Sequence, residues 1–351
     1  MIRFVPALID GGPTPYIVES LLHEREIREV LISAYYLKER PDFYLAIAKK
    51  LKNSGKIILA DSGGFTFLKR NITVTPERVF DLQKKMGADI IFTLDLPVTV
   101  KMNNGHVLER LKTTLENAKR SLELKRRYNY DAKLYAVVPA HNESQSADLA
   151  RQYEELGVDG IAIGSLVPRA LDLSGLSRII LAIRKAVQDM PLHVFGVAGF
   201  STIYMLAKLG VESFDSMKYA HGARYREYHL PRGAMVYIGP RYTTLRKGLS
   251  KETYDLIPCS CPYCLKARTF GYYVQATAES AATMAMHNLL VMLNEVKLIN
   301  IAIKAGWFDL LLKDRAKIYP SLAKATQSVG MIEQNKTFGG EITDRIHSGR
   351  S

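Results

Sequence analysis

Short apolar runs alternate with amphipathic stretches along most of this chain, and the alternation restricts its fold more than any other feature. Thr75-Pro76-Glu77 and Phe200-Ser201 each place a hydroxyl near the start of a helical stretch. Strands that alternate with helices form parallel βα units, and eight units favour an α/β fold, the (β/α)8 TIM barrel. An open doubly wound sheet is the alternative. The predicted strands are 2–7, 30–35, 57–60, 90–94, 133–138, 160–163, 193–197 and 213–217.

The three cysteines of the chain lie in one short segment, Cys259-Ser-Cys261-Pro-Tyr-Cys264, and His287 follows on a predicted helix over 277–305. Three thiolates and one imidazole complete the tetrahedral coordination of Zn²⁺, and a site closed by four protein ligands is usually structural. The sequence therefore predicts a structural zinc site that fastens an irregular segment to a long helix. Thiols gathered in this way also indicate a reducing compartment.

The chain is strongly basic, with a formal net charge of +13, and 47% of its residues are hydrophobic. This charge is compatible with a polyanionic partner such as nucleic acid, although a basic surface also serves solubility alone. No run approaches the roughly 20 apolar residues of a membrane span, and the first residues resemble a strand instead of a signal peptide. We therefore expect no membrane interaction and a cytoplasmic location, or the host cytoplasm if a phage encodes the chain.

The pattern divides the chain into three parts. Residues 1–250 form the barrel that carries the active site, and 251–330 hold the zinc motif and C-terminal helices packed on the barrel. Residues 331–351 form a flexible tail. Within these parts we expect a hairpin in 220–238 and a helix over 310–326.

Three aspartates stand at the ends of predicted strands. Asp61 follows the third strand, Asp95 follows the fourth, and Asp215 lies in the eighth. The carboxyl ends of barrel strands meet at one rim, so we expect these side chains to share a site. Two carboxylates beside a glycosidic carbon permit double displacement, in which one attacks and the other manages the leaving-group proton. Carboxylates at a rim also bind magnesium or phosphosugars, so the residues alone leave several reactions open.

Each of these aspartates stands in a longer motif, and further motifs accompany them. In chain order the motifs are Asp61-Ser-Gly-Gly-Phe65, Phe92-Thr-Leu-Asp95, Gly157-Val-Asp-Gly160-Ile-Ala-Ile-Gly164, Phe195-Gly196-Val197-Ala-Gly199, Phe214-Asp215-Ser216, and the cysteine cluster with Met286-His287-Asn288. Together and in this order they resemble the motifs of the tRNA-guanine transglycosylases. The resemblance covers residues 57–300 and implies a (β/α)8 barrel with bound structural zinc.

The resemblance also implies a role for each matching residue. Asp215 is the nucleophile that attacks C1′ of a nucleotide and expels guanine, and Asp61 is the general acid and base. Zinc is the implied cofactor and a redox cofactor is not needed. The implied base-binding residues are Ser62, Phe65, Asp95, Gly164, Ser165 and Gly196, and the implied zinc ligands are Cys259, Cys261, Cys264 and His287.

The chain departs from the family's pattern where that family contacts nucleic acid. The family's Gly-x-Gln-Gly falls at Val137-Val138-Pro139-Ala140, so the glutamine contact with the base is absent or comes from His141 or Asn142. The segment that handles tRNA is replaced over 218–226. A divergent branch of the family places 7-deazaguanines such as preQ0 into DNA, and this chain looks like that branch.

We therefore expect exchange of guanine in DNA for a 7-deazaguanine, with preQ0 as the base, through a covalent aspartyl-nucleotide intermediate. The alternatives are a tRNA-guanine transglycosylase, a catalytically inactive paralogue that binds nucleic acid, and another barrel enzyme such as a phosphosugar isomerase or aldolase. An extruded target base needs stacking partners, and Tyr219, Tyr225 and Tyr228 are candidates. Basic residues between Arg224 and Arg268 are candidates for phosphate contacts. Because relatives of this kind often dimerise near the zinc region, we also expect a homodimer.

Overall fold

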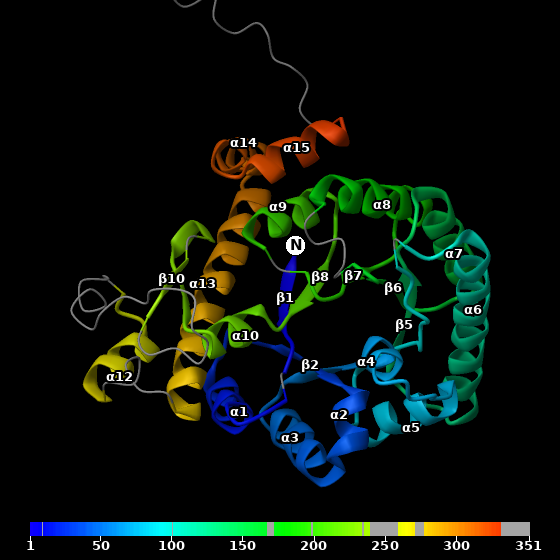
Figure 1. The fold of residues 1–351 in the computed structure, drawn as a ribbon, viewed down its shortest axis with the longest axis horizontal. Coiled ribbons are helices and arrows are strands. Elements are labelled where there is room, and N and C mark those ends of the chain that lie inside the picture. The colour runs from blue at the N-terminus through cyan, green and yellow to red at the C-terminus, as the bar shows by residue number, and fades with distance from the viewer. Residues whose placement is uncertain are drawn as a thin grey trace, which may run out of the picture.

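The computed structural model describes residues 1–8, 10–99, 101–166, 172–197, 199–233, 235–238, 259–270 and 277–330. Within this part of the chain, eight parallel strands form one sheet in the order β1-β8-β7-β6-β5-β4-β3-β2 (Figure 1). The strands are β1 (Arg3–Pro6), β2 (Glu29–Ser33), β3 (Ile57–Asp61), β4 (Ile90–Phe92), β5 (Lys133–Pro139), β6 (Gly160–Gly164), β7 (Leu192–Val194) and β8 (Ser213–Ser216).

The two edges of this sheet meet. Ala7, which follows β1, forms a parallel bridge with Leu31 of β2. The amide of Leu8 also donates to the carbonyl oxygen of Leu31, at 2.9 Å. These contacts nearly close the barrel, so the predicted (β/α)8 fold is confirmed and the open doubly wound sheet is wrong.

Helices surround the barrel and begin largely where the sequence predicts. The Thr75 hydroxyl accepts a hydrogen bond from the amide of Arg78 and so caps its helix. The predicted cap at Ser201 is wrong, because Gly199 occupies the capping position and makes no side-chain hydrogen bond. The helices are α1 (Thr14–His23), α2 (Ala34–Glu39), α3 (Pro41–Asn53), α4 (Gly64–Lys69), α5 (Pro76–Lys85), α6 (Asn104–Arg127), α7 (Glu143–Leu156), α8 (Leu173–Ala186), α9 (Phe200–Lys208) and α10 (Lys218–Arg224).

The alternation of side chains along the strands directs the aspartates inward. In β3, Ile58 packs in the cluster between strands and helices, whereas Leu59 packs inside the barrel. Asp61 lies two positions beyond Leu59, so it shares the inner face of the sheet. In β8, Phe214 packs on the outer side, and Asp215 therefore faces the interior.

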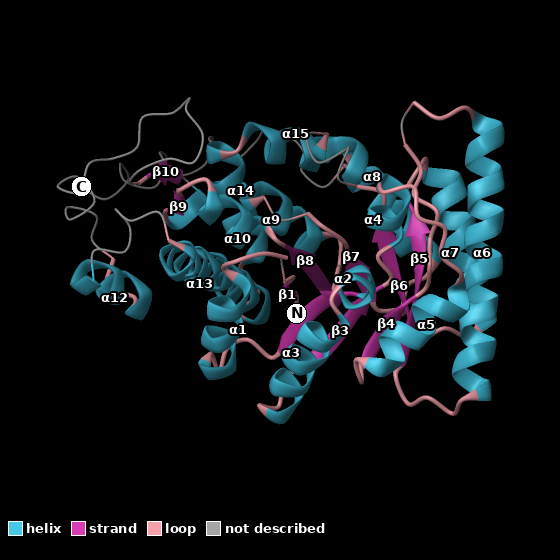
Figure 2. Ribbon diagram, turned by 60° about the horizontal axis from the view of Figure 1, so that its bottom comes forward, coloured by secondary structure: helices cyan, strands magenta, loops and turns pink. Residues whose placement is uncertain are grey.

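The described residues that follow α10 form a hairpin and four helices beside the barrel. The strands β9 (Glu227–His229) and β10 (Met235–Tyr237) pair antiparallel, joined through the 3-10 turn η2 (Pro231–Gly233). Figure 2 shows α12 and α13 together on the side of the barrel near β1 and α1. The helices are α12 (Pro262–Phe270), α13 (Ala278–Lys304), α14 (Phe308–Ile318) and α15 (Pro320–Ser328).

These elements test three expectations from the sequence. The long helix predicted over 277–305 is confirmed as α13. The helix predicted over 310–326 is two helices, α14 and α15, because Pro320 begins a new helix and cannot donate a backbone hydrogen bond within the first. The hairpin predicted in 220–238 is confirmed only for β9 and β10, since α10 occupies the beginning of that range.

α13 is long and apolar enough to cross a membrane by length and composition. However, 56% of its apolar window is buried within the protein, as is usual for the core helix of a globular fold. It contacts α1, α9, α10, α12 and α14. The predicted boundary near residue 250 and the predicted tail over 331–351 lie outside the described residues, so that division of the chain stays a prediction.

Candidate active site and metal centre

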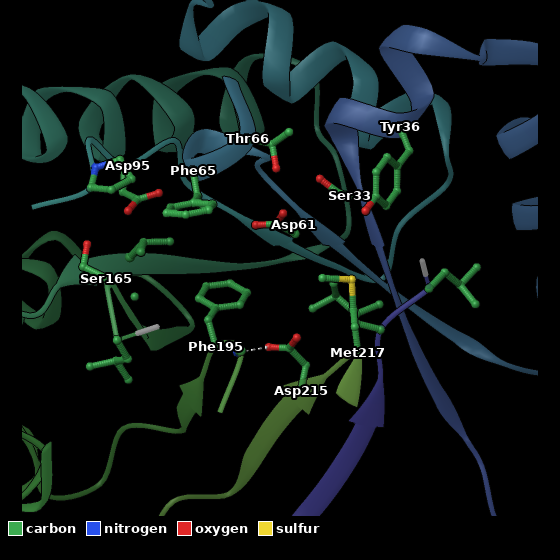
Figure 3. Close-up of a pocket in the computed structure, with 18 of the residues that line it drawn as sticks. Ser33, Tyr36, Asp61, Phe65, Thr66, Asp95, Ser165, Phe195, Asp215 and Met217 are labelled. Atoms are coloured by element: carbon green, nitrogen blue, oxygen red, sulfur yellow. Dashed lines mark hydrogen bonds between the residues drawn. The ribbon is translucent and has the colours of Figure 1, made fainter. Parts of the chain in front are cut away.

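A cavity of about 200 Å³ lies at the carboxyl ends of the barrel strands. It brings Asp61, Asp95 and Asp215 together from β3, the segment after β4, and β8. Figure 3 shows the three carboxyl groups around one space. The other strands contribute the wall residues Ala7, Ser33, Val137, Gly164, Ser165, Phe195 and Gly196.

The Asp215 carboxylate is held at one oxygen by two neighbouring groups. Its Oδ1 accepts a hydrogen bond from the amide of Gly196 at 3.0 Å (Figure 3). The Nε2 atom of His193 lies 3.3 Å from the same oxygen. Gly196 adopts a φ of +67°, a conformation that favours glycine and that turns its amide toward β8.

His193 is a site residue that sequence reasoning missed. Its side chain is fully buried, and its Nδ1 atom lies 2.9 Å from the hydroxyl oxygen of Ser213. The parallel register pairs His193 of β7 with Ser213 of β8, which places the imidazole beside Asp215. The available signal was a single polar residue within the apolar run Leu192–Val194.

Burial changes the protonation of the other two aspartates. Desolvation raises the pKa of Asp61 to about 6, against the lowering effect of the Ser33 hydroxyl and with a further rise from the charge of Asp215. Desolvation also raises the pKa of Asp95 to about 7, and the charge of Asp61 adds to it. Near neutral pH these carboxyl groups therefore exchange protons readily, as acid–base chemistry requires.

Two aromatic rings border the space between the carboxyl groups. Figure 3 shows the rings of Phe65 and Phe195 on opposite sides of this space. Phe65 is 52% exposed, whereas the Phe195 ring packs on Phe92 with ring centroids 4.7 Å apart. Rings arranged in this way can stack on both faces of a flat ligand.

Gly64 and Gly164 lie close to Asp95, where a side chain at either position would crowd this residue. A Cβ atom at Gly64 would lie 2.8 Å from the carbonyl oxygen of Asp95, so α4 approaches this residue only because position 64 lacks a side chain. A Cβ atom at Gly164 would lie 3.2 Å from Val137 and 3.5 Å from the Asp95 carboxylate. Glycine at 164 thus leaves the carboxyl group of Asp95 accessible from the cavity.

The remaining predicted base-binding residues differ in position. Ser165 lines the cavity, and its hydroxyl accepts a hydrogen bond from the amide of Val98 at 3.0 Å. Ser62 is buried and does not line the cavity, because its hydroxyl accepts from the amide of Gly64 at 3.3 Å.

The structure does not place a substitute for the missing glutamine where the sequence suggested one. Neither His141 nor Asn142 lines the cavity, and Asn142 instead caps α7 by accepting from the amide of Gln145 at 2.8 Å. Val137 occupies that wall with an apolar side chain.

Two of the three tyrosines suggested for base stacking are fully buried, so the suggestion is wrong for them. Tyr219 donates to the carbonyl oxygen of Ala7 at 3.2 Å, and Tyr228 stacks on the ring of His287. Tyr225 is 44% exposed and remains a candidate.

The predicted phosphate contact is wrong for Arg226, which lies within the suggested range of basic residues. Arg226 is buried and donates to the hydroxyl of Ser280 at 2.8 Å. Residues 239–258 of that range lie outside the described part of the chain.

The predicted zinc ligands form a compact group. The ligand atoms of Cys259, Cys261, Cys264 and His287 all lie within 4.8 Å of one another, so the group could hold a metal ion. The His287 Nδ1 atom lies 3.6, 3.5 and 3.3 Å from the three sulfurs in turn. Tetrahedral zinc with ordinary Zn–S and Zn–N bonds sets this separation at about 3.6 Å. The donor set and its spacing therefore fit zinc.

Neighbouring groups orient these ligands. The Nε2 atom of His287 donates to the carbonyl oxygen of His229 at 2.8 Å, which leaves Nδ1 to face the sulfurs. The Tyr228 ring stacks on the imidazole with centroids 3.9 Å apart, and its hydroxyl lies 3.1 Å from the sulfur of Cys264. The hairpin, α12 and α13 meet at this one point.

A family model described as queuine tRNA-ribosyltransferase matches residues 6–321 of the chain. The chain belongs to this family. The match runs from the end of β1 through the rest of the barrel, the metal cluster, α13 and α14. This family agrees with the resemblance that the sequence motifs carry.

Several similar proteins carry the name tRNA-guanine(15) transglycosylase. One from Methanococcus aeolicus is 28% identical over 305 residues, covering 84% of this chain and 45% of its own length. Another from Pyrococcus abyssi is 29% identical over 328 residues, covering 90% of this chain and 52% of its own length. One from Methanosarcina mazei is 27% identical over 322 residues, with 86% and 61% covered. The chain thus spans about half the length of the curated relatives it matches.

These names bear on the choice of nucleic acid. The sequence led us to expect DNA as the substrate, with tRNA as the alternative. The relatives are named for guanine in tRNA, so the comparisons support the tRNA alternative better than the DNA reading.

The buried carboxyl group of Asp95 makes the stability of the folded protein depend on pH in a way that can be tested. Because its pKa is raised from 3.8 to about 7, the folded protein keeps a proton that the unfolded chain loses. Its contribution to stability is therefore full below pH 3.8 and is lost as the pH rises to about 7. Asp95→Asn cannot ionise, so it will be more stable than the wild type at pH 8, by on the order of a few kcal/mol.

Urea unfolding of both proteins at pH 8 and at pH 4 measures this effect. The advantage of Asp95→Asn will shrink at pH 4, because the wild-type carboxyl is then protonated in the folded protein and, with an ordinary pKa of 3.8, partly protonated in the unfolded chain as well. An advantage of equal size at both values would show that burial does not control this carboxyl.

Proposed function

We propose that this chain is a guanine transglycosylase that acts on tRNA and exchanges guanine for a 7-deazaguanine. The observation that carries the proposal is the cavity around which Asp61, Asp95 and Asp215 gather and which two aromatic rings border. The family match and the names of the relatives support guanine and tRNA as the substrates. The incoming 7-deazaguanine rests on the sequence resemblance.

The exchange takes two displacements at C1′ of the nucleotide. Asp215 attacks C1′, the bond to guanine breaks, and its electron pair leaves with the base. Asp61 supplies the proton that the departing guanine needs. The incoming base then gives its proton to Asp61 and attacks C1′, and the ester bond to Asp215 breaks. Two inversions preserve the configuration of the sugar.

Asp95 and the two rings would hold the base during both steps. A carboxyl with a pKa near 7 can present either a hydroxyl donor or acceptor oxygens to the edge of a purine. Phe65 and Phe195 would cover its two faces. A base stacked between the rings would exclude water from this space, and this would strengthen its hydrogen bonds.

Zinc would be held by Cys259, Cys261, Cys264 and His287 and would supply folding energy, with no part in the exchange. We accordingly propose that residues 1–250 carry the active site, that 251–330 form a zinc-fastened unit packed on the barrel, and that 331–351 are a tail.

Transfer of labelled guanine into nucleic acid tests the function. We expect incorporation into guanine-containing tRNA and no incorporation into duplex DNA of matched length. Asp215→Asn serves as the control for label that is bound without being incorporated. Incorporation into DNA alone would reverse the choice of substrate, and incorporation into neither polymer would contradict the proposed reaction.

A further inference from the structure

We propose that His193 is a positioning residue for Asp215, fixing which carboxylate oxygen attacks the sugar. The inference rests on the proposed function, because it assigns a role around the nucleophile of that reaction. It follows from a buried chain of contacts that joins Ser213, His193 and Asp215 along β7 and β8.

The hydrogen bonds to Asp215 converge on one oxygen. The Gly196 amide and the His193 Nε2 atom both lie within hydrogen-bonding distance of Oδ1, at 3.0 and 3.3 Å. Two donors on Oδ1 stop the carboxylate from rotating about its last bond. Oδ2 is then the oxygen that approaches C1′.

The two partners of the ring favour one tautomer of His193, because the Asp215 carboxylate can only accept whereas the Ser213 hydroxyl can donate or accept. A neutral imidazole has one N–H donor and one acceptor nitrogen. The Ser213 hydroxyl, 2.9 Å from Nδ1, can donate to that nitrogen. Nε2 then carries the proton and donates to Asp215. The opposite tautomer would set a lone pair against the carboxylate in a fully buried place, where an unmade hydrogen bond is destabilising.

Aromatic packing holds the imidazole in this orientation. The His193 ring packs against both Phe92 and Phe195, with ring centroids 5.1 and 4.8 Å away. Phe195 itself lines the cavity. His193 therefore supports two parts of the site, the nucleophile and one of the aromatic walls.

The contact matters most when the ester to the sugar breaks. Oδ1 is the carbonyl oxygen of that ester, and the carboxylate regains its negative charge as the bond from Oδ2 to C1′ is lost. Donors on Oδ1 stabilise this returning charge and so improve Asp215 as a leaving group. Orientation of Oδ2 helps the first displacement as well.

Substitutions of His193 can distinguish its hydrogen bond to Asp215 from its contribution to packing. His193→Phe keeps a buried ring but removes both hydrogen bonds, and we expect kcat to fall about 10–100-fold with little change in KM for the base. His193→Gln retains an amide donor that can reach Oδ1, and we expect kcat within about threefold of the wild type. His23→Gln is the control, since this exposed side chain ends α1 at the opposite end of the barrel from the cavity.

A loss of packing alone would predict the reverse order for these variants. His193→Phe would then be active, and His193→Gln would be impaired. Equal kcat values for wild type and His193→Phe, or a change in KM alone, would overturn the proposal.

Nitrogen NMR of ¹⁵N-histidine-labelled protein tests the contact without any turnover. We expect the His193 signals to show a proton on Nε2 and none on Nδ1, and to shift in Asp215→Ala. A proton on Nδ1 with bare Nε2 would overturn the positioning role even if exchange occurs. If the NMR result is as expected but the wild type exchanges no base in any nucleic acid, the proposed function fails and the His193–Asp215 contact stands.

Discussion

Asp215→Asn will abolish base exchange, lowering kcat by a factor of about 10⁴ or more, as expected when a covalent nucleophile is removed. An amide oxygen is a poor nucleophile toward C1′ and cannot form the ester. The substitution nevertheless keeps the size of the side chain and an oxygen that can accept from the Gly196 amide. Single-turnover transfer of labelled guanine measures the loss.

The loss must come from chemistry and not from unfolding. We therefore expect Asp215→Asn to keep the zinc content, the thermal midpoint and the tRNA affinity of the wild type. Denaturing electrophoresis of quenched reactions adds a second readout, since wild-type protein will carry covalently bound tRNA and the variant will not. Exchange by Asp215→Asn at a comparable rate would assign the nucleophile to another residue.

Cys264→Ser will remove the metal and destabilise the protein strongly. Structural zinc contributes about 10–16 kcal/mol of apparent binding energy in small zinc peptides, whereas whole domains are stable by only about 5–15 kcal/mol. Cys264 is fully buried beside Tyr228 and His287, so serine at this position leaves a weak ligand in a closed site. We expect loss of the bound zinc and a much lower thermal midpoint.

Metal analysis and thermal unfolding measure this effect. Wild-type protein will contain one zinc per chain, and a strong chelator will lower its midpoint toward that of Cys264→Ser. Ser260→Ala is the matched control, because this exposed side chain lies between two ligands and should change neither quantity. Full zinc content in Cys264→Ser, with an unchanged midpoint, would contradict the predicted ligand set.

The sequence anticipated the barrel because its signals are local. Each strand is a short apolar run, and the residue that directly follows the run lies at the carboxyl end of the strand. Asp61 and Asp215 could be placed at the rim for this reason, since side chains alternate along a strand. The metal ligands were equally accessible, because three of them share one short segment and His287 lies on a strongly predicted helix.

Burial was harder to anticipate. Tyr219 and Tyr228 lie in a segment rich in Tyr, His and Arg, which suggested exposed side chains that stack on a base. Both are fully buried. Contacts between α10, β9 and α13 decide this, and they join positions far apart in the chain. The choice of nucleic acid was also beyond the sequence, since replaced loops indicate that a contact has changed without indicating which polymer is bound. The names of the relatives favour the tRNA alternative over DNA.

The eight alternating strands, the aspartates at their ends and the grouping of three cysteines with His287 were determined by the sequence alone, because period and spacing fix where such side chains point. The partnership of His193 with Asp215 and the raised pKa of Asp95 were decided by the tertiary structure. Both depend on which side chains the closed barrel brings side by side and on how much water it excludes from them. Those quantities arise only when distant segments pack together.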